Sequence, residues 1–165
     1  MDLEALFEQH QPALLRYLTR YTGDSEEAAD AAQETYLRLV ERPPPRTHNI
    51  RAWLFTVATN VVRDERRRQR ADDRMHAAVA RIPSAVRNLP PDVLYEQAER
   101  RRMVHRMLEQ LSEKERTILL MWEGGFSHPE IAEAVGWEWR SIGPSIARSL
   151  RKLSGDIRRL KEGFR

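Results

Sequence analysis

The chain has 165 residues, no cysteine, and 28 Lys and Arg against 25 Asp and Glu, which gives a net charge of +3. The lack of cysteine excludes a disulfide scaffold and a thiolate metal site. No stretch approaches the roughly 18 consecutive apolar residues of a membrane-spanning helix, and no basic segment followed by an apolar run opens the chain. These features predict no membrane insertion, point to the cytoplasm, and suit one domain or two small ones.

Apolar residues in steps of three and four predict a first helix over residues 3–21, with Pro12 expected to kink or split it. Gly23 ends this helix. Asp24 and Glu27 have the spacing of a capping box that begins a second helix. We expect the inward face of the second helix to carry Ala29, Ala32, Tyr36, Leu37 and Val40. Three prolines at 43–45 end it.

A third helix is predicted from Ile50 to about Arg70. Its apolar stripe consists of Ile50, Trp53, Leu54, Val57, Ala58 and Val61. Trp53 is expected in the core, whereas Phe55 lies off the centre of the stripe and would be either peripheral packing or a partner contact. Residues 71–100 lose the stripe and contain three prolines, so we interpret them as a flexible linker with helical fragments.

Residues 101–165 again have helical spacing. One apolar stripe ends at Leu111, and Ser112 with Glu115 forms a capping box before a helix with Ile118, Leu119 and Trp122 inward. Ser127 with Glu130 forms another capping box, and Gly136 is a C-terminal cap. No alternating pattern of strand length occurs. The chain is therefore predicted to be all-α, with two helical domains at 1–70 and 101–165 joined by a linker at 71–100.

Catalytic chemistry has no support in the sequence. Five histidines are scattered without the spacing of metal ligands, and neither a phosphate-binding glycine loop nor a nucleophile motif is present. We therefore predict no catalytic residues, no metal site, no cofactor and no enzymatic activity.

Nucleic-acid binding has better support. Residues 127–153 have the length of a helix-turn-helix, whose second helix reads the major groove. Arginines and a lysine flank that second helix, at Arg140, Arg148, Arg151 and Lys152. The alternative is an ordinary helical hairpin with a solvated basic face. The same choice between a binding surface and a solvated face applies to the basic end of the third helix and to the acidic residues of the second.

Three segments in this order resemble bacterial sigma factors of the extracytoplasmic-function (ECF) group. Residues 23–39 (GDSEEAADAAQETYLRL) resemble the segment that binds core RNA polymerase. Residues 51–60 (RAWLFTVATN) resemble the promoter-melting helix. Residues 111–116 (LSEKER) and 125–136 (GFSHPEIAEAVG) resemble the C-terminal helix-turn-helix domain.

The resemblance implies a promoter-specificity subunit whose partners are core RNA polymerase (beta-prime clamp and beta flap), promoter DNA and an anti-sigma factor. The implied polymerase contacts are Glu27, Asp30, Gln33 and Glu34. The minus-ten element, where a base is flipped out at a cost of a few kcal/mol, would be held by Arg46, Thr47, His48, Asn49, Trp53, Thr56, Asn60, Arg63, Arg66 and Arg67. The duplex minus-thirty-five element would be contacted by Ser127, Arg140, Ser141, Ser145, Arg148, Arg151 and Lys152.

One segment departs from the family. Its recognition helix usually begins Gly-Thr-Val-Lys-Ser-Arg-Leu, whereas this chain has RSIGPSI at 140–146, without basic residues at 143 and 145. Pro144 implies that the helix either starts late or is kinked. Trp137 and Trp139 are expected to pack in the core, or else to contact DNA or a partner. The alternative function is a sigma-like decoy or adaptor that binds polymerase or an anti-sigma factor without reading DNA.

The charges are segregated along the chain. Residues 1–62 carry a net −3, residues 63–70 a net +3, residues 71–125 zero and residues 126–165 a net +3. An acidic region and two basic patches therefore coincide with the three implied surfaces.

Overall fold

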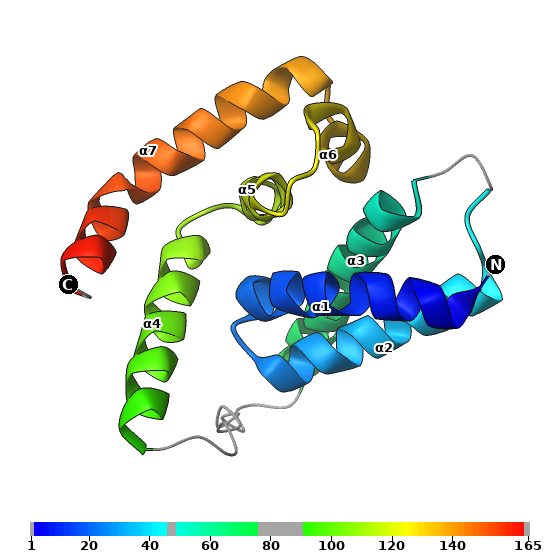
Figure 1. Cartoon of the computed structure of the whole chain (residues 1–165), viewed down its shortest axis with the longest axis horizontal. Helices are drawn as coiled ribbons and strands as arrows, with labels where there is room; N and C mark the ends of the chain where they lie inside the picture. Colours follow the sequence, from blue (N-terminus) through cyan, green and yellow to red (C-terminus); the bar gives the residue numbers. More distant parts are fainter. Residues whose placement is uncertain (1, 46–48, 76–90, 164–165) are drawn as a thin grey trace. The chain divides into compact units, whose positions relative to one another are not determined.

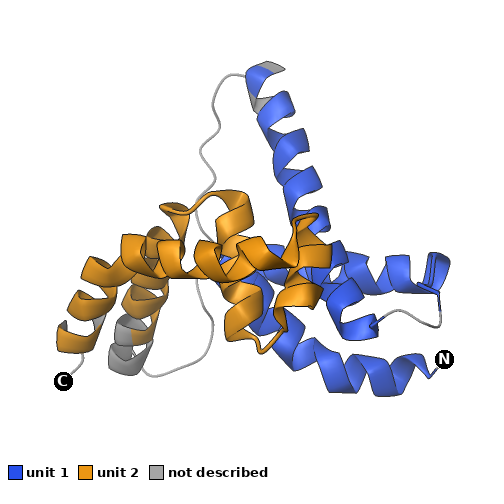
Figure 2. Cartoon of the chain, turned by 90° about the horizontal axis from the view of Figure 1, so that it is seen from above, with its two compact units in different colours: residues 1–85 blue, residues 86–165 orange. Residues whose placement is uncertain are grey.

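The computed structural model describes residues 2–45, 49–75 and 91–163, and within these ranges every regular element is a helix. The chain forms two compact units, Met1–Ala85 and Val86–Arg165 (Figure 2). The all-α prediction is confirmed. The helices are α1 (Leu3–Thr22), α2 (Ser25–Glu41), α3 (Ile50–Met75), α4 (Pro91–Glu109), α5 (Glu113–Glu123), α6 (His128–Val135) and α7 (Trp139–Gly163).

In the first unit, α1 and α2 form an antiparallel pair and α3 packs across both (Figure 1). Gly23 ends α1 with φ of 78°, a left-handed conformation that favours glycine. Pro12 lies inside a single α1, so the prediction of a split helix is wrong. The lost backbone hydrogen bond costs about 3 kcal/mol, which the buried side chains of Leu14, Leu18 and Tyr21 offset.

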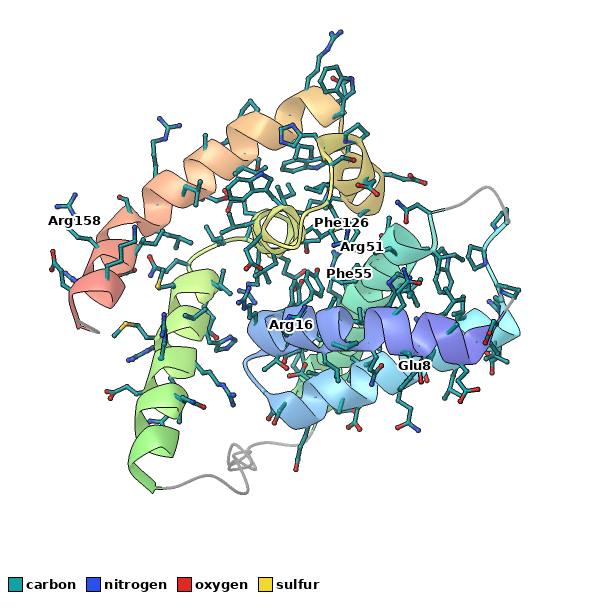
Figure 3. All side chains as sticks on the ribbon, viewed as in Figure 1. Glu8, Arg16, Arg51, Phe55, Phe126 and Arg158 are labelled. Carbon is teal, nitrogen blue, oxygen red and sulfur yellow. The ribbon has the colours of Figure 1, made fainter. Side chains whose placement is uncertain are left out.

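The core of this unit joins α1 to α3 through aromatic side chains. Phe55, labelled in Figure 3, is 2% exposed, and its ring centroid lies 5.0 Å from that of Tyr17. The Tyr17 and Thr59 hydroxyls form a buried hydrogen bond of 2.6 Å. Phe55 is therefore a core residue and not peripheral packing, whereas Trp53 is half-buried and not in the core. The buried face of α3 is rotated from Trp53 and Val57 toward Phe55 and Val62.

The predicted inward face of α2 is wrong at three of its five positions, since Ala32 is buried and Tyr36 is half-buried. Leu37 and Val40 are 52% and 59% exposed, and Ala29 is exposed as well. The buried positions are Ala28, Ala31, Ala32, Thr35 and Leu39. Small side chains let α2 approach its neighbours closely, so the helix is oriented by its alanines rather than by its largest apolar residues.

In the second unit, both predicted capping boxes are present. Ser112 and Glu115 cap α5, and Ser127 and Glu130 cap α6. Arg116 is only 8% exposed, and its Nε donates to the carbonyl of Leu108 at 3.1 Å, which satisfies an acceptor in the last turn of α4. Trp122 is 42% exposed, so its predicted inward position in α5 is wrong.

The observed bounds of α3, α4 and α7 differ from those predicted from the sequence. α3 continues to Met75 and α4 begins at Pro91, so both enter the range assigned to the linker, of which residues 76–90 lie outside the described residues. α7 begins at Trp139 and contains Pro144. A late start at Pro144 is therefore wrong. The proline lies in the second turn of the helix, where it removes one backbone hydrogen bond.

Candidate nucleic-acid interface

A stripe of polar and aromatic residues runs along α3. Asn49, Trp53, Thr56, Asn60, Arg63 and Arg67 follow one another at intervals of four and three residues. This spacing places them on one helix face, and all of them are exposed or half-buried. The 18 residue steps from Asn49 to Arg67 span roughly 27 Å of helix. The structure therefore brings six of the ten residues predicted for the minus-ten element onto one continuous surface, the α3 stripe.

The beginning of the α3 stripe is fixed by local hydrogen bonds. The side-chain oxygen of Asn49 accepts from the backbone N–H of Ala52 at 3.2 Å, so Asn49 caps α3. The hydroxyl of Thr56 donates to the Ala52 carbonyl at 2.8 Å, so this donor is used within the helix. The other residues expected to hold the flipped base, Arg46, Thr47 and His48, lie outside the described residues.

Arg66 lies off the stripe and binds within the first unit. Its Nε and Nη2 donate to the Glu27 carboxylate at 2.8 and 3.1 Å. The same Nη2 donates to the carbonyl of Thr22 at 3.0 Å, at the end of α1. The side chains of Arg66 and Glu27 are only 25% and 28% exposed. One guanidinium group thus ties α1, α2 and α3 together, which conflicts with separate roles for Arg66 in DNA binding and Glu27 in polymerase binding.

The acidic candidates on α2 share their face with exposed apolar residues. Asp30 and Gln33 are exposed, and Leu37 and Val40 follow on the same side of the helix. Glu34 lies at the edge of this face and accepts from Arg38 at 2.9 Å. We call Asp30, Gln33, Leu37, Val40 and Glu41 the outer face of α2. It combines carboxylates with apolar side chains, as docking surfaces for a helix commonly do.

The exposed face of α7 carries Arg140, Ser141, Pro144, Ala147, Arg148 and Arg151. Its opposite face is buried and includes Ile142, Ile146 and Leu153. Because α7 is the second helix of the helix-turn-helix formed with α6, its exposed face occupies the position that enters the major groove in this motif.

Three of the residues predicted for the minus-thirty-five element have other partners or positions. Lys152 donates to both carboxylate oxygens of Glu115, at 2.8 and 3.0 Å. Ser145 is 1% exposed, so its side chain is part of the core and direct DNA contact is not compatible with this position. Ser127 caps α6, and its hydroxyl donates to Glu130 at 2.7 Å.

Trp137, which precedes α7, and Trp139, which begins it, are surface residues. Trp137 is 36% and Trp139 is 56% exposed, so their predicted core packing is wrong. Both line an open hollow together with Pro129, Ala132, Glu138 and Arg140. The Arg140 guanidinium lies 5.5 Å from the centroid of the Trp139 ring, and the Lys114 ammonium lies 5.3 Å from that of Trp137. Cations at these distances are attracted by the indole rings.

The two helices of the motif approach closely at Gly143. A Cβ atom added there would lie 3.4 Å from Cε1 of His128, the first residue of α6. The imidazole of His128 therefore occupies the space beside position 143, where the family pattern has a lysine.

The described residues include no group of three or more His, Cys, Asp or Glu that could hold a metal ion. None of their helices is long and apolar enough to cross a membrane.

Sequence reasoning missed the outer apolar residues of α2 and the small residues in the middle of α7. The first were detectable, because Ala28, Ala31, Ala32, Thr35 and Leu39 repeat at helical spacing and place Leu37 outward. The second group, Pro144 and Ala147, had no signal of its own, since a proline in the second turn of a helix argues against the helix itself.

The fold and these surfaces define an all-α protein with a helix-turn-helix unit of the DNA-binding type. The family model described as Sigma-70 region 2 matches residues 6–72, and the model described as Sigma-70, region 4 matches residues 101–153. Together these two matches span most of the chain. The chain belongs to the sigma-70 family of RNA polymerase sigma factors, in its ECF group.

Similar proteins carry the same description. The chain is 45% identical over 71 residues to the ECF RNA polymerase sigma factor SigL of Mycobacterium tuberculosis, a match that covers 41% of this chain and 40% of SigL. It is 24% identical to the RNA polymerase sigma factor YlaC of Bacillus subtilis, over 98% of this chain and 95% of YlaC. It is 28% identical to the ferric citrate uptake sigma factor FecI of Escherichia coli, over 91% and 87%.

Two solved structures share the fold. The sigma factor RpoE from Bartonella quintana, in complex with the anti-sigma factor NepR, superposes with a TM-score of 0.76 at 19% identity, over 95% of this chain and 97% of that one. The extracytoplasmic function sigma factor SigJ of Mycobacterium tuberculosis gives a TM-score of 0.59 at 22% identity, over 91% and 52%.

Proposed function

We propose that this chain is an ECF-type sigma factor that binds core RNA polymerase in the cytoplasm, recognises minus-ten and minus-thirty-five promoter elements and promotes DNA opening. Its partners are the beta-prime clamp and beta flap of the polymerase, promoter DNA and an anti-sigma factor. It carries out no catalysis of its own. The observation that supports this most strongly is the α3 stripe, which combines an exposed asparagine and arginine with a half-buried tryptophan along one face.

The residues of the α3 stripe suit an opened strand. A flipped base has lost its stacking and pairing, and both can be replaced by an aromatic ring and an amide. Trp53 and Asn60 supply these groups, and Arg67 supplies a cation for the phosphates. We exclude Arg66 from this set because its guanidinium is bound to Glu27 and to the Thr22 carbonyl.

Promoter opening by core polymerase and the purified chain, followed by permanganate reactivity of unpaired thymines, tests this proposal. We expect Arg67→Ala and Asn60→Ala to reduce opening several-fold. Arg68→Ala is the matched control, because Arg67 and Arg68 are 74% and 71% exposed and each forms an exposed ion pair three residues back. Equal promoter opening by the Arg67 and Arg68 variants would refute a role for the α3 stripe in promoter binding. No opening by the unmodified chain that still binds core would favour the decoy.

The outer face of α2 is proposed as the polymerase-docking surface. Asp30→Lys places a cation at its centre, and we expect weaker binding to core polymerase in a pull-down or a fluorescence titration. Glu8→Lys makes the same charge change at an exposed position on α1 (Figure 3) and serves as the control. Exposed substitutions of this kind change stability by about 0.5 kcal/mol or less. Equal affinities of the two variants would refute the docking assignment.

A further inference from the structure

One line of exposed residues along α7 has only small apolar side chains in its middle, and Ser141 and Arg148 lie beside that line. Arg140, Pro144, Ala147 and Arg151 lie at intervals of four, three and four residues, so they line up along one side of the helix. All four are exposed. Pro144 and Ala147, which occupy the middle, have neither a donor nor an acceptor in their side chains. Among the described residues of this line, hydrogen-bonding side chains occur only at its two ends.

This composition limits what the middle of α7 can recognise. Base edges in the major groove are distinguished by hydrogen-bond donors and acceptors, with one exception, the C5-methyl group of thymine. An apolar side chain gains by contact with that methyl group and gains nothing from the amino and keto groups of the other bases. Short side chains also let the helix backbone approach the floor of the groove.

The arginines around this apolar centre suit the sugar-phosphate backbone. Arg140 and Arg151 are eleven residues apart, or roughly 16 Å along the helix, against a major groove about 12 Å wide. Arg148 and Arg151 form no ion pair with a carboxylate within the part of the chain that the structure describes, in contrast to Lys152, which is bound to Glu115. Exposed guanidinium groups on both sides of an apolar strip match a groove that has phosphates on both rims.

We propose that α7 reads thymine methyl groups through Pro144 and Ala147, with its arginines on the flanking phosphates. This inference rests on the proposed function, because it takes duplex DNA as the ligand of the helix-turn-helix. It specifies that sequence preference in the upstream promoter element comes from apolar contact with thymine. Arginine and amide contacts to purines are secondary.

Replacement of thymine by uracil tests this directly, because it removes the methyl group and keeps the base pair. Duplexes would first be selected from a random pool with the full chain bound to core polymerase. The preferred upstream element would then be synthesised with deoxyuridine at one thymine position at a time. We expect about fourfold weaker binding at one or two positions, the factor that corresponds to burial of one methyl group.

Variants of α7 separate a methyl contact from an effect on DNA shape. Ala147→Gly removes the proposed contact, so thymine and uracil duplexes should bind it equally at one position. Ala147→Ser is a second variant, because serine forms helices better than glycine does. It places a hydroxyl group at this position and should reduce the difference in affinity between the thymine and uracil duplexes. Arg148→Ala is the matched control. It should weaken both duplexes by the same factor and keep the fourfold ratio.

The outcomes distinguish this inference from the function on which it rests. Specific binding that no uracil changes overturns the methyl contact and leaves the sigma-factor proposal intact. A uracil effect that persists unchanged at every affected position in both Ala147 variants overturns the contact at Ala147, because at least one position should lose the effect. If the chain opens promoters with core polymerase but shows no sequence preference in the upstream duplex, recognition of a minus-thirty-five element is refuted, and the methyl contact with it.

Discussion

Arg66 shows how a residue type can suggest one role while its neighbours determine another. A basic helix end predicts phosphate contacts, yet this guanidinium makes two hydrogen bonds to Glu27 and one to the end of α1. Both side chains are about three-quarters buried. Hydrogen bonds between charged groups contribute about 1.5–3 kcal/mol when they are shielded from water. The pair is therefore expected to stabilise the first unit.

Arg66→Ala should lower the free energy of unfolding of the full chain by about 1.5–3 kcal/mol, measured by urea unfolding. Arg67→Ala is the control, because its ion pair with Asp64 is 3.6 Å long and exposed. Such pairs contribute about 0–1 kcal/mol. A double-mutant cycle with Glu27→Gln should show coupling between Glu27 and Arg66. Equal stability of the two arginine variants would contradict a structural role for Arg66.

At the scale of elements, the capping boxes of α5 and α6 were predictable from the sequence, whereas the buried faces of α2 and α3 were not. Asp24 caps α2 as predicted, but the Glu27 side chain binds Arg66 and completes no capping box. Ser112, Glu115, Ser127 and Glu130 act within one turn, so local spacing determines them. The orientation of α2 depends on how closely its alanines approach α1 and α3, which is a tertiary property. The core prediction for Trp137 and Trp139 is wrong for a related reason: size and apolar character alone do not bury a side chain, because exposed apolar surface is common.

The capping box of α5 also interacts with α7, because Lys152 of α7 binds the Glu115 carboxylate. The hydrogen bond from Lys152 and, next, the backbone N–H of Ser112 lower the pKa of Glu115 below its usual value. A carboxyl group with a lowered pKa in the folded state stabilises the fold at neutral pH, and this contribution is lost as the pH falls through its folded pKa. The cap of α5 and the packing of α7 are thus linked through one carboxylate.

Glu115→Gln should therefore destabilise the chain at pH 7, and the difference from the unmodified chain should shrink as the pH falls below about 4. Lys152→Met removes the charge but keeps most of the apolar stem, and it should lose only the part of this pH dependence that Lys152 supplies. Chemical unfolding at several pH values measures both. A difference that stays constant from pH 7 to pH 3 would show that the Glu115 charge contributes nothing to stability.

At the scale of the whole molecule, each unit has its own core and its own charge balance. Residues 1–85 carry 13 basic and 13 acidic groups, and residues 86–165 carry 15 and 12. The net charge of +3 thus belongs to the unit that contains the helix-turn-helix. Domain number and order were predictable because each unit repeats the pattern of capped amphipathic helices. The ends of α3 and α4 were not, since prolines and charges within 71–100 obscure the helical pattern.

We expect fragments 1–85 and 86–165 to fold separately, because each buries its own set of apolar side chains. Each should lose its helical circular dichroism signal in one cooperative transition. Domains of about 80 residues are only marginally stable, so low midpoints are expected. A fragment with helical signal but no cooperative transition would show that its core needs the other unit.

The close approach of His128 to Gly143 affects how this recognition helix could be exchanged. A Cβ at 143 would lie in ordinary van der Waals contact with the imidazole, at 3.4 Å, so alanine fits at this position. In a graft of a relative's lysine-bearing helix onto this chain, the Cβ of the lysine would therefore lie in van der Waals contact with His128. Position 128 is thus the first place to look for a compensating substitution when the proposed recognition helix is exchanged.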